Sequence, residues 1–331
     1  MTLVHPTGRV RNAAFFALSL LALALLVLVS ISIGAGDFSW SELRHGRASE
    51  AWSLVAISRL PRTLALLLAG VSLAVAGFLM QMIVQNRYVE PTTAGTSESA
   101  MLGILFVMLV MPDIPVIGRM LIASGFALAG TLLFLLILQR VPLRSPFLAP
   151  LIGLVLGGVV HAVATYFAYR HDMMQSLHAW MTGDFSGVLR GRYEMLWIGC
   201  VLAAVTYLVA DRFTILGMGK GFSTNLGINH RGLMLFGLVI IALIATVVGV
   251  TAGTIPFLGL IVPNVVSLVL GDNMRRALPW IALMGGGLVL LCDIIGRLVR
   301  YPYEIPIGVI MGVVGSMLFL LLILRGREVP S

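Results

Sequence analysis

Ten long apolar runs divide the sequence and limit its possible folds more than any other feature. A helix needs about 20 mostly apolar residues to cross a bilayer, and two of the runs, 99–111 and 256–270, are short by that measure. Only 11% of the residues are charged, against about 25% in an average soluble domain. We therefore predict an all-α, polytopic membrane protein with about ten transmembrane helices in a single transmembrane domain, 1–331. The runs cover 13–33, 63–84, 99–111, 115–138, 148–169, 194–211, 232–251, 256–270, 278–298 and 305–324.

Basic residues at both ends of the chain indicate which side of the membrane the termini occupy. An even number of spans places both ends on one side, and Arg9, Arg11, Arg325 and Arg327 favour the cytoplasm. The first apolar run is too long for the core of a signal peptide, so we interpret it as a retained helix.

The sequence offers no catalytic or metal-binding constellation. It contains no nucleophile elbow, zincin motif or metal-ligand spacing, and the Gly217–Thr224 stretch lacks the spacing of a P-loop. Its basic residues are scattered between apolar runs, which excludes a nucleic-acid-binding protein. We expect a transport subunit that is not an enzyme and that carries no cofactor of its own.

Two ionisable residues, His161 and Asp293, fall inside apolar runs. Ion-coupled carriers keep such groups at membrane depth, so an ion-coupled secondary transporter of a small solute is the alternative interpretation. Arg297 follows Asp293 by four residues, and side chains at that spacing meet on one face of a helix. A structural ion pair is therefore the favoured interpretation of Asp293.

Arginines gather where the second run begins, at Arg59 and Arg62, and where the ninth ends, at Arg297 and Arg300. In the predicted topology all four face outward. They could snorkel to lipid headgroups or dock an acidic partner through carboxylates, and the residues alone favour neither.

Two further segments interrupt the apolar pattern. The polar, glycine-rich stretch 217–231 joins two runs, and Ser223 or Thr224 is expected to cap a short helix there. A second break runs from Gly253 to Asn264 around a short helix. Backbone interrupted at membrane depth must be buried or line a cavity.

These motifs, spread over most of the chain, resemble the permease subunits of binding-protein-dependent ABC importers for ferric siderophores, haem and cobalamin (the FecCD type). The matching stretches are Arg59–Arg62, Gly70–Gln81, Asn86 with Glu90-Pro91, Trp180–Gly183, Phe257–Pro263, Asp293 with Arg297, and Glu304–Gly308.

The chain departs from the family pattern at Arg87, where proline is usual, and at Asn264 and Ser267, where histidine and arginine are usual. These departures resemble the branch that serves catecholate-type siderophores such as petrobactin, anguibactin or vibriobactin.

The resemblance implies a type II ABC importer permease fold in a bacterial inner membrane. It implies a second permease subunit in a homo- or heterodimer, two ATPase subunits that bind ATP and Mg, a siderophore-binding protein, and a ferric siderophore as ligand. It assigns Arg59, Arg62 and Arg297 to docking of the binding protein. The 217–230 loop is assigned to ATPase coupling, through Gly217, Gly219, Gly221, Ser223, Asn225, Leu226 and Gly227. The resemblance also assigns a set of residues to the translocation path or to its structural motifs: Gln81, Asn86, Glu90, Pro91, Pro263, Asn264, Asp293, Glu304 and Pro306.

Overall fold

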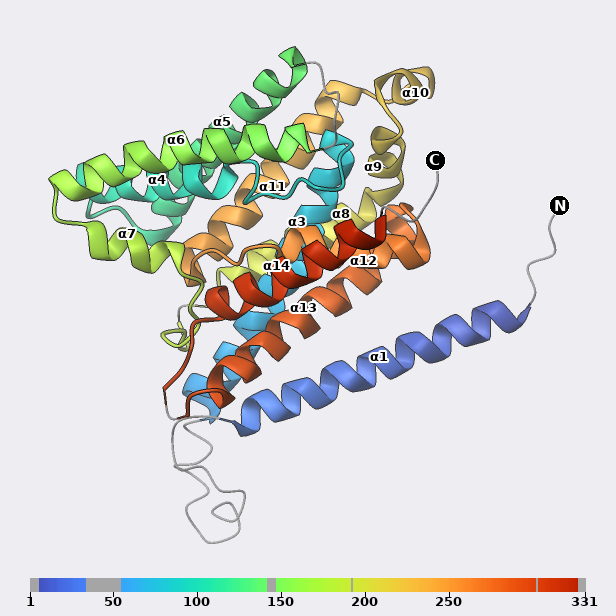
Figure 1. The fold of residues 1–331 in the computed structure, drawn as a ribbon, viewed down its shortest axis with the longest axis horizontal. Coiled ribbons are helices and arrows are strands. Elements are labelled where there is room, and N and C mark those ends of the chain that lie inside the picture. Colours follow the sequence, from blue (N-terminus) through green and yellow to red (C-terminus); the bar gives the residue numbers. More distant parts are fainter. Residues whose placement is uncertain (1–5, 34–54, 142–146, 192, 302, 327–331) are drawn as a thin grey trace, which may run out of the picture.

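The computed structural model describes residues 6–33, 55–141, 147–191, 193–301 and 303–326, and in these ranges it is all helical (Figure 1). The side chains from which the location of the termini was predicted, Arg9, Arg11, Arg325 and Arg327, fall outside what it describes. The helices are α1 (Pro6–Ser32), the π-helical turn η1 (Val55–Arg59), α3 (Leu60–Val84), α4 (Thr96–Val110), α5 (Val116–Arg140), α6 (Leu148–Arg170), α7 (Met174–Met181), α8 (Leu196–Leu208), α9 (Ala210–Gly217), α10 (Lys220–Asn225), α11 (His230–Ala252), α12 (Leu258–Leu270), α13 (Met274–Leu298) and α14 (Ile307–Gly326).

Each of the ten predicted apolar runs coincides with a helix or a bent helix pair. Seven helical segments of the described chain are long and apolar enough to cross a membrane, and an eighth follows if α8 and α9, bent by 70°, form one span. The two runs that were short by length, 99–111 and 256–270, are the shorter apolar helices α4 and α12.

Helix α3 is the core of the bundle, and its small residues explain how its neighbours approach it. In its span, 83% of the most apolar window is buried. A Cβ atom built on Gly70 would lie 2.6 Å from the carbonyl oxygen of Gly285 in α13. Small residues allow such backbone contacts in lipid. Two further glycines pack in the same way within this chain, since Gly285 meets α3 and Gly308 meets Gly183.

Helix α1 lies along the outside of the bundle and touches it mainly along α13 and at its C-terminal end (Figure 1). Only 6% of its apolar window is buried. Phe16 and Trp280 stack edge to face with ring centroids 5.2 Å apart. Because so little of α1 is buried, its position depends on these few contacts and on those around Ser32 at its C-terminal end.

The bundle has two ends that bear on function, which we call the arginine end and the α10 end. The arginine end holds the first turn of α3 and the last turns of α1 and α13. The α10 end holds the last turn of α3, the first turn of α13, and helices α9 and α10. The 25 residues of α3 separate the two ends by about 37 Å, at 1.5 Å per residue.

Candidate functional site

At the arginine end, four charged side chains form one cluster, in which Asp293 and Arg297 are buried and Arg62 and Glu304 are partly exposed. Arg62 donates to Asp293 Oδ1 at 2.8 Å and to Glu304 Oε2 at 2.6 Å. Arg297 pairs with the other oxygen of Asp293, one turn away on α13. The predicted Asp293–Arg297 pair is therefore confirmed, and it is extended by two partners from α3 and from the segment before α14.

Two arginines of this end also close the C-terminus of α1. Arg59 donates to the carbonyl oxygens of Ile31 and Ser32, both at 3.1 Å. Arg297 donates to the carbonyls of Ser30 at 3.0 Å and Ile33 at 2.9 Å. The last carbonyls of a helix have no partner within it and carry partial negative charge, so cationic side chains stabilise them. These contacts hold α1 against the bundle.

The geometry bears on both sequence interpretations of these residues. Arg59, Arg62 and Arg297 are 8%, 12% and 5% exposed, so they are neither snorkelling chains nor free surface charges in this conformation. Their docking role stays a prediction.

The two ionisable residues of the apolar runs differ in their surroundings. Asp293 is held by two arginines, whereas His161 has a buried Nδ1 without a partner among the described residues.

Midway along the bundle, Glu90 holds the start of α12. Its Oε1 accepts from the backbone N–H of Phe257 at 2.9 Å and from Thr92 Oγ1 at 2.6 Å. Gln81 donates to the carbonyl of Gly259 at 3.3 Å. A buried carboxylate at a helix N-terminus satisfies its free N–H groups and its dipole. Glu90 and Gln81 belong to the predicted motif. They supply hydrogen-bond partners for backbone groups at the break before α12, which would be costly to leave unpaired inside a membrane.

The predicted coupling loop, 217–230, starts at the last residue of α9 and folds as a turn, α10 and a second turn. Gly219 precedes α10 at φ +107° and Gly227 follows it at φ +74°, where other residues would be strained. The expectation that Ser223 or Thr224 caps this helix is wrong. Both lie inside α10, which begins after Gly219, and Ser223 is buried with its hydroxyl 2.8 Å from His230 Nδ1.

Apolar side chains remain exposed on this loop although no helix there is long enough to span. Met218, Phe222 and Leu226 are 63%, 49% and 56% exposed. Asn225 and Gly227 are exposed too, Gly221 has open space where a Cβ would stand, and Gly217 packs on Met82. Exposed apolar groups outside the spans indicate a surface that another protein covers.

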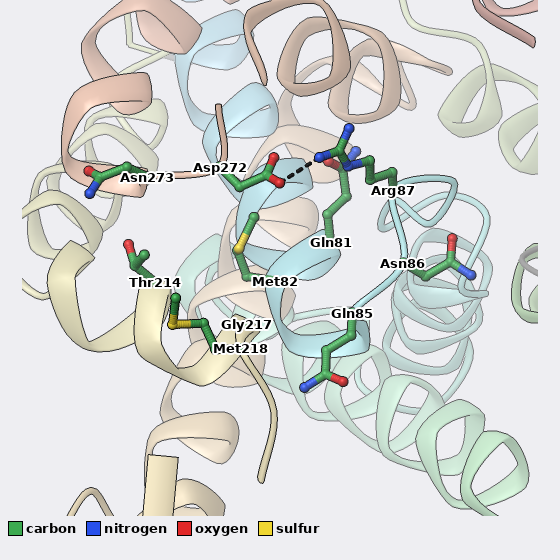
Figure 2. Close-up of a pocket in the computed structure, with 10 residues that line it drawn as sticks. All are labelled: Gln81, Met82, Gln85, Asn86, Arg87, Thr214, Gly217, Met218, Asp272 and Asn273. Atoms are coloured by element: carbon green, nitrogen blue, oxygen red, sulfur yellow. Dashed lines mark hydrogen bonds and ion pairs between the residues drawn. The ribbon is translucent and has the colours of Figure 1, made fainter. Parts of the chain in front are cut away.

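A cavity of about 490 Å³ lies between α3, α9 and the turn from α12 to α13 (Figure 2). Gln81, Gln85 and Asn86 line it on the α3 side, and Thr214 and Gly217 on the α9 side. Asp272 and Asn273 complete it from the turn.

Motif residues in and beyond the cavity wall hold the backbone around it. Asn264 donates from Nδ2 to the carbonyl of Arg87 at 2.7 Å, and Asn86 Oδ1 accepts from the N–H of Tyr88 at 2.8 Å. Pro91 and Pro263 are buried, the latter inside α12. Pro306 lies just before α14. Together they place the predicted path residues along α3 and α12 and at the arginine end, as several groups and not as one site.

Sequence reasoning missed the residues that tie α9 to α13. Asp211 of α9 pairs with Arg275 of α13, and Thr214 Oγ1 accepts from the N–H of Met274 at 3.1 Å. Asp272 was also missed, although the polar Gly-Asp-Asn turn between two apolar runs was visible. In the described part of the chain, no group of three or more His, Cys, Asp or Glu residues could hold a metal ion.

Known transport proteins share the fold and much of the sequence of this chain. A solved structure assigned to the metal-chelate type of ABC transporter, in an inward-facing conformation, matches the fold with a TM-score of 0.79 at 22% identity, covering 95% of this chain and 99% of that one. The petrobactin import system permease protein YclN of Bacillus subtilis is 44% identical over 89% of this chain and 93% of its own length. The ferric-anguibactin transport system permease protein FatD of Vibrio anguillarum is 39% identical over 89% of this chain and 94% of its own. The profile of the FecCD transport family matches residues 21–325, and the chain belongs to that family.

Proposed function

We propose that this chain is the permease subunit of an ATP-driven importer that passes a ferric siderophore from a binding protein into the cytoplasm. Its similarity to a petrobactin permease at 44% identity over 89% of the chain is the observation that carries the proposal. The similarity to an anguibactin permease supports the same ligand class.

The α9–α10 loop is the proposed contact with the ATPase. Its exposed apolar side chains, Met218, Phe222 and Leu226, need a partner surface, and the loop follows directly on a bent span. The ATPase subunits would bind the ATP and Mg, so this chain would need no cofactor of its own. In this arrangement the α10 end and both termini face the cytoplasm of a bacterium, and a second permease subunit, identical or different, completes the path.

At the opposite end, Arg62 is the docking arginine best placed to reach a partner. Its partner Glu304 is 25% exposed, and its own Nε–H is buried without an acceptor among the described residues. A carboxylate of a binding protein could therefore replace Glu304 and gain a bidentate contact. Arg59 and Arg297 would act in docking only after releasing α1.

The docking proposal is tested by binding of the siderophore-binding protein to the permease–ATPase complex in nanodiscs. Arg62→Glu should weaken binding at least as much as a lost buried charge pair, about 2 kcal/mol or roughly thirtyfold in Kd. Arg119→Glu is the control, because that arginine is only part-buried and bonds to carbonyls of its own loop. Equal affinity of the Arg62 variant and the wild type would exclude Arg62 from docking.

The transport function is tested by reconstitution with the companion ATPase and binding protein. Uptake of radiolabelled ferric petrobactin should require ATP on the ATPase side and be indifferent to proton or sodium gradients. Uptake that follows an ion gradient without ATP would overturn the proposal in favour of an ion-coupled carrier.

A further inference from the structure

We propose that Arg87 and Asp272 are positioning residues of the coupling machinery. They would hold the α10 end of α3 to the turn before α13, so that a displacement of α9 is passed to both helices together. This inference rests on the proposed function, because it supposes that an ATPase moves the α9–α10 loop.

Two sets of polar contacts join helix α9 to α13 and to α3, the helices on either side of the cavity. On one side it is tied to α13, through Thr214 at the N–H of Met274 and through Asp211 paired with Arg275. On the other side it meets α3, where Gln85 Nε2 lies 3.5 Å from the carbonyl of Leu216. Helix α10 contacts both α9 and α11, and of these two helices α9 is the one that lines the cavity between α3 and the turn before α13.

The cavity lies between these two sets of contacts. It separates the last turn of α3 from the turn before α13, and α9 closes one side of it (Figure 2). A cavity leaves its lining without partner atoms, so its walls can approach or part at little cost in lost contacts. A push from α9 could therefore separate the last turn of α3 from the turn before α13, while the two helices stay packed at Gly70 and Gly285.

The Arg87–Asp272 pair closes the cavity on the side away from α9. Arg87 Nη2 lies 2.5 Å from Asp272 Oδ2. Figure 2 marks this ion pair with a dashed line between the segment that follows α3 and the α12–α13 turn. Asn264 holds the carbonyl of the same arginine at 2.7 Å. Arg87 and Asn264 stand at two positions where the chain departs from the family pattern, and the structure joins them into one clamp across 177 residues of sequence.

The exposure of the pair makes a positioning role distinguishable from a structural one. The side chains of Arg87 and Asp272 are 54% and 46% exposed. Ion pairs of this kind contribute little to stability because water screens them. The α3–α13 contact at Gly70 and Gly285 does not depend on the pair, so its loss should leave the fold intact.

The experiment compares Arg87→Ala, Asp272→Ala and the charge swap Arg87→Asp/Asp272→Arg in the reconstituted importer. Each is assayed for ferric petrobactin uptake per ATP hydrolysed and for the thermal stability of the complex. Each alanine variant should lower uptake per ATP by about threefold, the effect of an exposed pair that biases a conformational equilibrium. Thermal stability should stay at the wild-type value, and the charge swap should restore most of the uptake per ATP.

Arg140→Ala is the matched control, since it removes an exposed arginine at the end of α5 that does not line the cavity. Unchanged uptake per ATP in both alanine variants would overturn the inference, and so would a charge swap that restores nothing. A fall in thermal stability that parallels the fall in uptake would show that the pair has only a structural role, and this result would also overturn the inference. A wild-type complex without ATP-dependent uptake would instead overturn the proposed function.

Discussion

Two neighbouring glycines of α13 give a sharp test of how the core is packed. In Gly285→Ala the new Cβ would lie 2.6 Å from Ala74 Cβ and from the carbonyl oxygen of Gly70. The helices must separate by at least 0.4 Å to reach 3.0 Å, the closest approach that Cβ atoms show. In Gly287→Ala the nearest atom is the end of the Leu23 side chain, 3.7 Å away, which is an ordinary contact.

The difference between the two variants isolates the packing cost. Both exchange glycine for alanine in the same helix, so the gain in helix propensity is nearly the same and cancels. Overpacking of a tight core costs about 1–3 kcal/mol, and that is the expected difference in stability between them. Because membrane complexes often unfold irreversibly, unfolding rates in detergent at a fixed temperature are the suitable measurement. Equal unfolding rates for the two variants would refute the direct backbone contact between α3 and α13.

Substitutions at two further residues test the buried polar groups. Asp293→Asn removes the carboxylate shared by Arg62 and Arg297 and leaves buried charge unpaired, so it should destabilise the protein by about 3–5 kcal/mol. Asp172→Asn is the control, because Asp172 is exposed and lies at φ +56°, and comparable heat stability of the two variants would contradict the cluster. Glu90→Ala should cost about 1–3 kcal/mol by freeing donors at the start of α12, whereas Glu90→Gln keeps an acceptor and should cost less. Equal losses in the two Glu90 variants, measured by the same unfolding assay, would show that its side chain does not cap α12.

Much of the architecture could be predicted from the sequence because hydrophobic length and local spacing determine it. Apolar runs separated by polar breaks gave ten segments that coincide with helices, and four-residue spacing predicted the Asp293–Arg297 pair. The two short runs were recognised by length alone. That Glu90 accepts a hydrogen bond at the start of one of them, α12, was not foreseen.

The rest depends on contacts between residues far apart in the chain. Arg297 bonds to the carbonyl of Ser30 across 267 residues, and nothing local predicts that an arginine expected on the surface closes another helix. The clamp between Arg87 and Asp272 and the cavity behind it are likewise products of tertiary packing. The start of α10 was misplaced because Ser223 and Thr224 are good capping residues, yet the glycine at φ +107° makes the turn.

We expect this chain to provide a path but no energy source, and transport by reconstituted proteoliposomes tests that expectation. Proteoliposomes containing the permease with its ATPase and binding protein are compared with proteoliposomes containing the permease alone, both supplied with radiolabelled ferric petrobactin and ATP. We expect that only the complete complex accumulates iron against a gradient. Accumulation by the permease alone to the same level would show that the chain has an energy source of its own.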